Sequence, residues 1–215
     1  MTDPVIEKIR RFAESHFAED GSGHDWWHVH RVWNMAKHLA EAEGADRRIV
    51  EIAALLHDVA DWKLADGGEA QGLNTIRDLL KDDLSVEEVE RICEIISRVS
   101  FKGAGVDTPT CSLEGQVVQD ADRLDALGAV GIARTFAYGG NRGRLIHHPD
   151  IPPERHDSFE AYKKNNGPST NHFYEKLLLL KDRMNTETAR QIAEARHKFM
   201  EQYLDHFFRE WDGEI

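Results

Sequence analysis

The dipeptide His57-Asp58 lies in the most densely apolar stretch of the sequence, between Leu55-Leu56 and Val59-Ala60. A carboxylate and an imidazole are costly to bury unless they pair with other groups or bind a metal ion. Adjacent side chains on a helix point about 100° apart, so these two pair poorly with each other but can both reach an ion between helices. The dipeptide therefore indicates a pair of metal ligands or a buried structural ion pair, and its pattern alone leaves both readings open.

A second concentration of acidic groups lies in residues 119–127, which contain Asp120, Asp122 and Asp125. Asp122 and Asp125 are three residues apart and share a helix face. Acidic groups this close repel one another at neutral pH unless a cation compensates them. The alternative is a solvated face with Arg123 as partner. It is less favoured because the flanking residues are apolar, namely Val117, Val118, Leu124 and Leu127.

The sequence around each histidine is needed to tell candidate metal ligands from other histidines. The chain has 12 of them, and the His-Asp dipeptide occurs three times, so the dipeptide alone is a weak signal. His24 and His28 are i,i+4 neighbours that could chelate a metal ion by themselves. His28 is close to the apolar stripe of its predicted helix, whereas His30 and His38 fall nearer the outer face and are predicted to meet solvent.

The elements that would position these groups are predicted to be helices, because apolar residues recur at helical spacing and no strand hairpin signal is present. The helix over 47–62 is too apolar for a surface helix and should be central. We expect one all-α domain over 1–215, a helical bundle with an irregular region at about 140–168. Of the other predicted helices, one starts at Pro4, one covers about 24–43, one runs from after Gly68 to 81, one starts at Ser85 and one starts near Leu113. A further helix lies within 128–143 and breaks down at Gly139-Gly140, and two long helices cover about 170–184 and 186–211.

Composition restricts the partners and the compartment. The chain has 215 residues and a formal net charge of −12, and an acidic surface repels nucleic-acid phosphates and anionic membranes. Two cysteines cannot form a disulfide framework, which favours a reducing compartment. No stretch approaches the roughly 20 apolar residues that span a bilayer. We therefore expect a cytoplasmic protein without a nucleic-acid or membrane partner.

With these residues in view, the chain resembles the HD-domain metal-dependent phosphohydrolases. The resemblance rests on His28 within HDWWHVHRV (24–32), His57-Asp58 within ALLHDVAD (54–61) and Asp122 within QDADRLDA (119–126). The segment NHFYEKLL (171–178) resembles a branch of small stand-alone bacterial members. The likeness covers roughly residues 5–211 and implies an all-α bundle of the HD-domain type.

The resemblance implies that His28, His57, Asp58 and Asp122 hold a divalent metal ion. Two imidazoles and two carboxylates with open positions suit Mn²⁺, Fe²⁺, Co²⁺, Ni²⁺ or Mg²⁺ better than a closed structural zinc site. Binuclear members of the superfamily place further histidines between the His-Asp pair and the last aspartate. Residues 58–146 contain no histidine, so we expect one ion.

Asp61, one helical turn after Asp58, is the candidate general acid or base, because related enzymes carry an acid or a histidine at this position. The alternative is a surface acid paired with Lys63 or Arg31. The stringent-response (p)ppGpp hydrolases resemble this pattern but carry a second acid directly after that position. Here the residue is Trp62, which disfavours that substrate.

Substrate phosphates need cations near the metal ion, and Lys63 and Lys102 are the candidates for this role, although any one lysine is more often simply exposed. The function expected is hydrolysis of a phosphate ester or anhydride in a small phosphorylated molecule. A nucleotide is favoured, and within the class a nucleoside triphosphate pyrophosphatase. The alternative is a non-catalytic sensor that binds a metal ion or a nucleotide. The tryptophans at 26, 27 and 33 suit either a homodimer face or a buried core.

Overall fold

The computed structural model describes residues 3–18, 24–60, 68–101, 106, 108–110, 112–154 and 166–215. Over these residues the chain is all-α: helices and turns are present and no strand is. This confirms the predicted fold class. In the same residues, no helix has the length and apolar character needed to cross a membrane.

The fold divides into two compact units. Unit 1 comprises Met1–Lys102 with Asp107–Asp122, and unit 2 comprises Gly103–Val106 with Arg123–Ile215. The boundary falls inside helix α6 (Leu113–Asp125). The single domain over 1–215 stays a prediction, and each unit is described by itself below.

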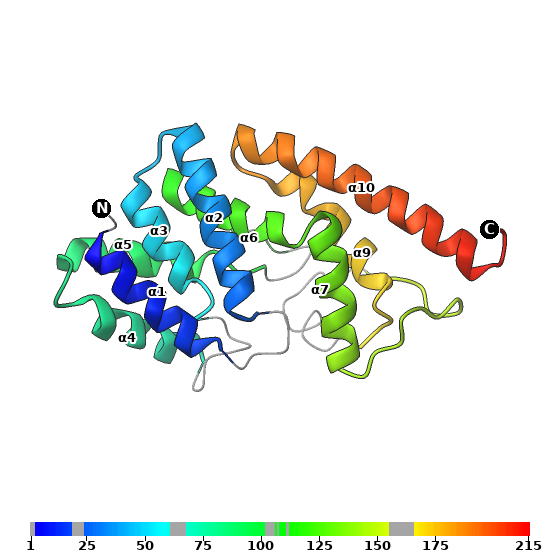
Figure 1. The fold of residues 1–215 in the computed structure, drawn as a ribbon, viewed down its shortest axis with the longest axis horizontal. Coiled ribbons are helices and arrows are strands. Elements are labelled where there is room, and N and C mark those ends of the chain that lie inside the picture. Colours follow the sequence, from blue (N-terminus) through cyan, green and yellow to red (C-terminus); the bar gives the residue numbers. More distant parts are fainter. Residues whose placement is uncertain are drawn as a thin grey trace. The chain divides into compact units, whose positions relative to one another are not determined.

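Unit 1 is organised around α3 (Arg47–Leu56), whose residues from Ile49 to Leu56 are all buried. This confirms that the most apolar helix is central. Figure 1 shows α3 beside α2, and it also packs against α1 and α5. The other helices that begin in this unit are α1 (Pro4–His16), α2 (Trp26–Glu43), α4 (Glu69–Leu80), α5 (Val86–Ser97) and α6.

Helix ends in unit 1 follow local sequence signals. The Ser85 side chain accepts from the Glu88 N–H, and the Glu88 carboxylate accepts from the Ser85 N–H, which is the predicted capping box. Gly44 ends α2 with a φ of 74°, in the left-handed region that glycine adopts without strain. Asp25 caps the start of α2 by accepting from the His28 N–H at 2.8 Å. That cap fixes the first turn of the helix that carries His28.

The prediction of one helix over 47–62 is wrong at its C-terminal end. Helix α3 stops at Leu56, and residues 57–60 form turns in which the Val59 N–H donates to Leu56 O at 3.0 Å. Ala54 O, the acceptor that the Asp58 N–H would use in a continuing helix, lies 2.8 Å from His57 Nδ1. The histidine side chain therefore bonds the last helical turn, and the change to turns re-aims the residues that follow.

Helix α6 is tied to the rest of unit 1 at two levels. Near its start, the Glu114 carboxylate accepts from the Asp46 N–H at 3.2 Å and pairs with Arg91 at 2.6 Å. One turn before Asp122, the Gln119 amide donates to Arg98 O at 2.7 Å. These contacts fix the rotation of α6 about its own axis.

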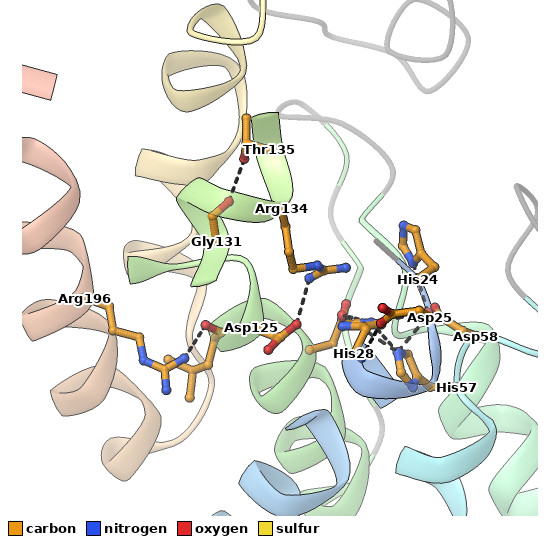
Figure 2. Close-up of polar contacts among 12 residues, drawn as sticks. His24, Asp25, His28, His57, Asp58, Asp125, Gly131, Arg134, Thr135 and Arg196 are labelled. Carbon is orange, nitrogen blue, oxygen red and sulfur yellow. Dashed lines mark hydrogen bonds and ion pairs between the residues drawn. The ribbon is translucent and has the colours of Figure 1, made fainter. Parts of the chain in front are cut away.

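Unit 2 contains α7 (Gly128–Asn141), α9 (Asn171–Glu175), the 3₁₀ turns η1 (Leu177–Leu179) and η2 (Lys181–Arg183), and α10 (Glu187–Trp211). Helices α7 and α10 pack together. Both hold the last turn of α6: Arg134 of α7 pairs with Asp125 at 2.9 Å, and Arg196 of α10 donates to Leu124 O (Figure 2).

Two helix predictions in unit 2 are wrong. Helix α7 does not break down at Gly139-Gly140 but continues to Asn141. Gly139 lies where a Cβ would come 2.0 Å from Ser169 Oγ, so the glycine permits close packing and does not mark a helix end. The region 170–184 is not one long helix, because Lys176 leaves the helical region at φ −140°. The apolar residues of this stretch are buried through shorter turns, as at Phe173, Leu177 and Leu180.

The region predicted to be irregular has no helix or strand at residues 142–154 and 166–170. It is nevertheless tied down. The Asn171 amide donates to Ile151 O at 3.0 Å, and the Glu175 carboxylate accepts from the Glu154 N–H at 3.1 Å. The motif NHFYEKLL thus contributes two side chains that anchor the preceding loop.

Gly72 offers a test of how tightly α4 packs against the turn after Asp58. A Cβ at Gly72 would lie 2.5 Å from Ala60 Cα and 2.6 Å from Val59 O, so either α4 or the turn would have to move. We expect Gly72→Ala to lower the free energy of unfolding by about 1–3 kcal/mol, measured by urea denaturation followed by circular dichroism.

Gly140→Ala is the control for this substitution. Among the described residues, no atom other than the chain neighbours and the backbone of the same helix lies within 4 Å of a Cβ at Gly140, so this change should leave stability equal or raise it by about 0.5–1 kcal/mol. Equal stability of Gly72→Ala and the wild type would contradict the close approach of α4.

Candidate metal centre

His28 lies at the centre of the cluster of polar side chains in unit 1. It is in the first turn of α2, and its residue is 0% exposed. Its Nε2 lies 3.2 Å from His57 Nε2 and 3.3 Å from Asp58 Oδ2 (Figure 2). The same atom is 3.6 Å from Asp122 Oδ1. One imidazole nitrogen therefore faces donor atoms from two other elements.

His57 has its tautomer fixed by the main chain. A carbonyl oxygen can only accept a hydrogen bond, so Nδ1, 2.8 Å from Ala54 O, must carry the hydrogen. In the neutral ring Nε2 then carries a lone pair, and it points toward His28 Nε2 and Asp58 Oδ1, the latter at 3.3 Å. A backbone carbonyl that orients a histidine in this way is a common partner of metal-binding imidazoles.

Asp58 follows directly and is buried. Its Oδ1 faces His57, and its Oδ2 faces His28 and, at 2.9 Å, His24 Nδ1. Burial alone raises the pKa of this carboxyl, but the neighbouring His57 and His24, with hydrogen bonds from His24 and His28, hold the pKa of Asp58 well below its ordinary value. Asp58 is therefore a carboxylate at neutral pH.

Asp122 approaches from α6. Its Oδ1 lies 3.6 Å from His28 Nε2 and 3.9 Å from His57 Nε2. Its side chain is 27% exposed, against 0% for His28, so solvent reaches the cluster on this side. The structure thus brings together four residues that are separated by up to 94 positions in the sequence, which is 122 minus 28.

The donor set fits a divalent cation. Two ligands bound at right angles to one six-coordinate ion, each about 2.1 Å from it, lie about 3 Å apart. The two imidazole nitrogens lie 3.2 Å from each other and 3.3 to 3.9 Å from the two carboxylates, which is close to this spacing. Lone pairs and carboxylates that face one another in a buried space repel unless a cation lies between them. In the described residues, donor atoms within 4.8 Å of one another form two groups: His24, His28 and Asp58, and His28, His57 and Asp122.

The structure does not describe the predicted catalytic and substrate-binding residues. Asp61, Lys63 and Lys102 lie outside the described residues, so their roles stay predictions. His24 also reaches the cluster, although the predicted ligand set does not include it. Its i,i+4 spacing to His28 was visible in the sequence, but its contact with Asp58 joins residues 34 positions apart and needed the structure.

The other two histidines of α2, His30 and His38, differ in their exposure to solvent. His38 is exposed, as predicted. His30 is not a solvent histidine: it is half-buried, and Trp26, Trp27 and Trp33 lie around its ring. Burial, helped by the charge of Lys37, lowers the pKa of His30.

The three tryptophans do not form one surface. Trp26 is buried, Trp27 is 62% exposed, and Trp33 donates from Nε1 to the Glu51 carboxylate. The homodimer stays a prediction.

Comparison with known proteins identifies the family of this chain. The model of the HD domain matches residues 26–127, a range that contains all four predicted ligands. The uncharacterized protein YpgQ of Bacillus subtilis (strain 168) is 43% identical over 199 residues, covering 92% of this chain and 89% of that protein. The chain therefore belongs to the HD-domain family.

Solved structures lead to the same family. A protein from Lactobacillus plantarum superposes with a TM-score of 0.89 at 39% identity, covering 99% of both chains. An HD-superfamily hydrolase from Bacillus thuringiensis matches with a TM-score of 0.74 at 48% identity, covering 96% of both chains. A structure of B. subtilis YpgQ in complex with ADP matches with a TM-score of 0.75 at 38% identity, covering 95% of this chain and 97% of that one.

Direct metal binding tests the cluster. We expect Mn²⁺ to raise the melting temperature of the metal-stripped protein and EDTA to reverse the rise, because an ion that binds only the folded state stabilises it by about 2.7 kcal/mol at 100 times the Kd. Asp58→Asn and His28→Gln should abolish the rise in differential scanning fluorimetry.

His38→Gln is the matched control, since it changes an exposed histidine of the same helix. It should keep the full metal-dependent rise. A rise that survives in Asp58→Asn would show that the ion binds elsewhere.

Proposed function

We propose that this chain is a metal-dependent phosphohydrolase that cleaves a phosphate anhydride in a nucleotide, with His28, His57, Asp58 and Asp122 as the ligands of one divalent ion. The observation that carries the proposal is the convergence of two imidazole nitrogens and two carboxylates in unit 1. Four such groups take up only part of the six positions that Mn²⁺ or Mg²⁺ offers. Positions are thus left for water and for a phosphate oxygen.

A bound divalent ion supplies two things to such a reaction: it polarises the phosphoryl oxygen and it lowers the pKa of a bound water. The chain's own residues do the rest. The carboxylates of Asp58 and Asp122 offset part of the ion's charge, and the main-chain bond to His57 Nδ1 keeps Nε2 directed at the site. The partly exposed Asp122 side marks the route by which a substrate would reach the cluster.

A nucleotide is the favoured substrate. The chain has a net charge of −12, so the ion and nearby cations would have to reverse the local field for an anionic substrate. Lys63 and Lys102 are proposed for this role and Asp61 for proton transfer. The ADP complex of the related YpgQ supports a nucleotide ligand, and within this class we propose a nucleoside triphosphate that is cleaved to release pyrophosphate.

The rival proposal is a non-catalytic sensor that binds a metal ion or a nucleotide. It requires the ligand cluster but neither open coordination positions nor proton transfer. A sensor would bind Mn²⁺ and nucleotide without turnover, whereas the hydrolase consumes its substrate. The full ligand set with solvent access at Asp122 favours the hydrolase.

Turnover of nucleotides decides between the two. We expect the Mn²⁺-loaded protein to hydrolyse members of a panel of ribo- and deoxyribonucleoside triphosphates, with separate detection of pyrophosphate and phosphate. Asp58→Asn should lower the rate by about 10³-fold or more, because loss of the ion removes several kcal/mol of transition-state stabilisation.

The control is again His38→Gln, which should retain wild-type turnover. Orthophosphate without pyrophosphate would replace the pyrophosphatase by a phosphatase of the same site. Metal binding without turnover of any nucleotide would favour the sensor.

A further inference from the structure

His24 differs from the four predicted ligands in its position in the chain. It precedes α2, next to the cap residue Asp25, and it lies outside the 26–127 range that the HD-domain model matches. Its side chain is 19% exposed, against 5% for Asp58. Its Nδ1 nevertheless lies 2.9 Å from Asp58 Oδ2, the shortest separation measured from this carboxylate to an imidazole nitrogen.

The two oxygens of Asp58 have different neighbours. Oδ1 faces His57 Nε2 at 3.3 Å, while Oδ2 faces His24 Nδ1 and His28 Nε2 (Figure 2). The torsion that turns an aspartate carboxylate is broad and weakly restrained by itself. A hydrogen bond to Oδ2 therefore selects the rotation of the group and hence the direction in which Oδ1 points.

A hydrogen on His24 Nδ1 is the arrangement that suits this contact without a second ion. A lone pair on Nδ1 would repel a carboxylate oxygen at 2.9 Å, whereas an N–H donates to it. A second cation between His24, His28 and Asp58 would need His28 Nε2 as a ligand. A ring nitrogen can bind only one ion, and this nitrogen already faces His57 and Asp122.

We propose that His24 is a positioning residue that donates from Nδ1 to Asp58 Oδ2 and so holds the Asp58 carboxylate in the orientation that the metal ion requires. The inference rests on the proposed role of Asp58 as a ligand, and it adds a residue to the machinery of the site. Partners of metal ligands that act in this way typically contribute 10–100-fold to metal affinity.

Three substitutions of His24 separate a donor from a ligand. His24→Ala removes the contact. His24→Asn places an amide nitrogen as many bonds from Cα as Nδ1, so it can keep the donor, and His24→Gln places that nitrogen one bond farther away. Binding of Mn²⁺ and of Ni²⁺ to the metal-stripped full chain is measured for each by titration calorimetry.

A positioning role predicts that His24→Ala weakens Mn²⁺ and Ni²⁺ by similar factors, about 10–100-fold. His24→Asn should restore most of the affinity for both ions, and His24→Gln less. His38→Ala, an exposed histidine of α2, should change neither. Helix content by circular dichroism and the melting temperature of each metal-free variant verify that it is folded.

Three outcomes would overturn the proposal. Unchanged affinity in His24→Ala would show that Asp58 is oriented without it. A selective loss of Ni²⁺ that His24→Asn does not repair would make His24 a ligand, because an imidazole favours Ni²⁺ over Mn²⁺. A wild type that binds neither ion would remove the basis of the proposal. Metal binding without nucleotide turnover, in contrast, would reject the hydrolase and leave the role of His24 standing.

Discussion

Four electron-rich atoms that face one another in a largely buried space are the constraint on which unit 1 depends. His28 Nε2 lies 3.2 to 3.6 Å from His57 Nε2 and from carboxylate oxygens of Asp58 and Asp122, and His57 Nε2 lies 3.9 Å from Asp122 Oδ1. Unless a hydrogen on His28 Nε2 or a positive charge lies among them, this arrangement is repulsive, and burial removes the water that would screen it. The helices around the cluster supply enough apolar burial, centred on α3, to hold the groups at these distances.

Each of the four side chains of the cluster is oriented by a different local contact. The Asp25 cap sets the first turn of the helix that carries His28, and the end of α3 lets His57 bond the main chain. Asp58 follows in a turn, and α6 is fixed in rotation by Glu114 and Gln119 before it presents Asp122. The cluster is therefore assembled from helix termini and one helix face. The positions of its side chains depend on where those helices begin and end more than on how long any helix is.

Much of the fold could be predicted from the sequence, because helical periodicity and the capping box at Ser85 are local signals, and the order of the His and Asp motifs predicted that His28, His57, Asp58 and Asp122 come together. The errors arose where a side-chain hydrogen bond or close tertiary packing overrides these signals. Helix α3 ends early because the His57 side chain bonds Ala54 O, and α7 passes through Gly139 because Ser169 packs there. The contact between His24 and Asp58 joins distant residues, and no spacing rule predicts it.

The bond between His57 Nδ1 and Ala54 O has a consequence for how this site tolerates sequence change. Every residue, proline included, carries a backbone carbonyl oxygen, so substitution at position 54 leaves this acceptor in place. The orientation of the His57 ring thus depends on the backbone and does not depend on which side chain stands at position 54. The Asp58 carboxylate differs, because its Oδ2 contacts the side chain of His24 and a substitution of His24 removes that contact. Two adjacent side chains of one cluster are accordingly sensitive to mutation of their partners to very different degrees.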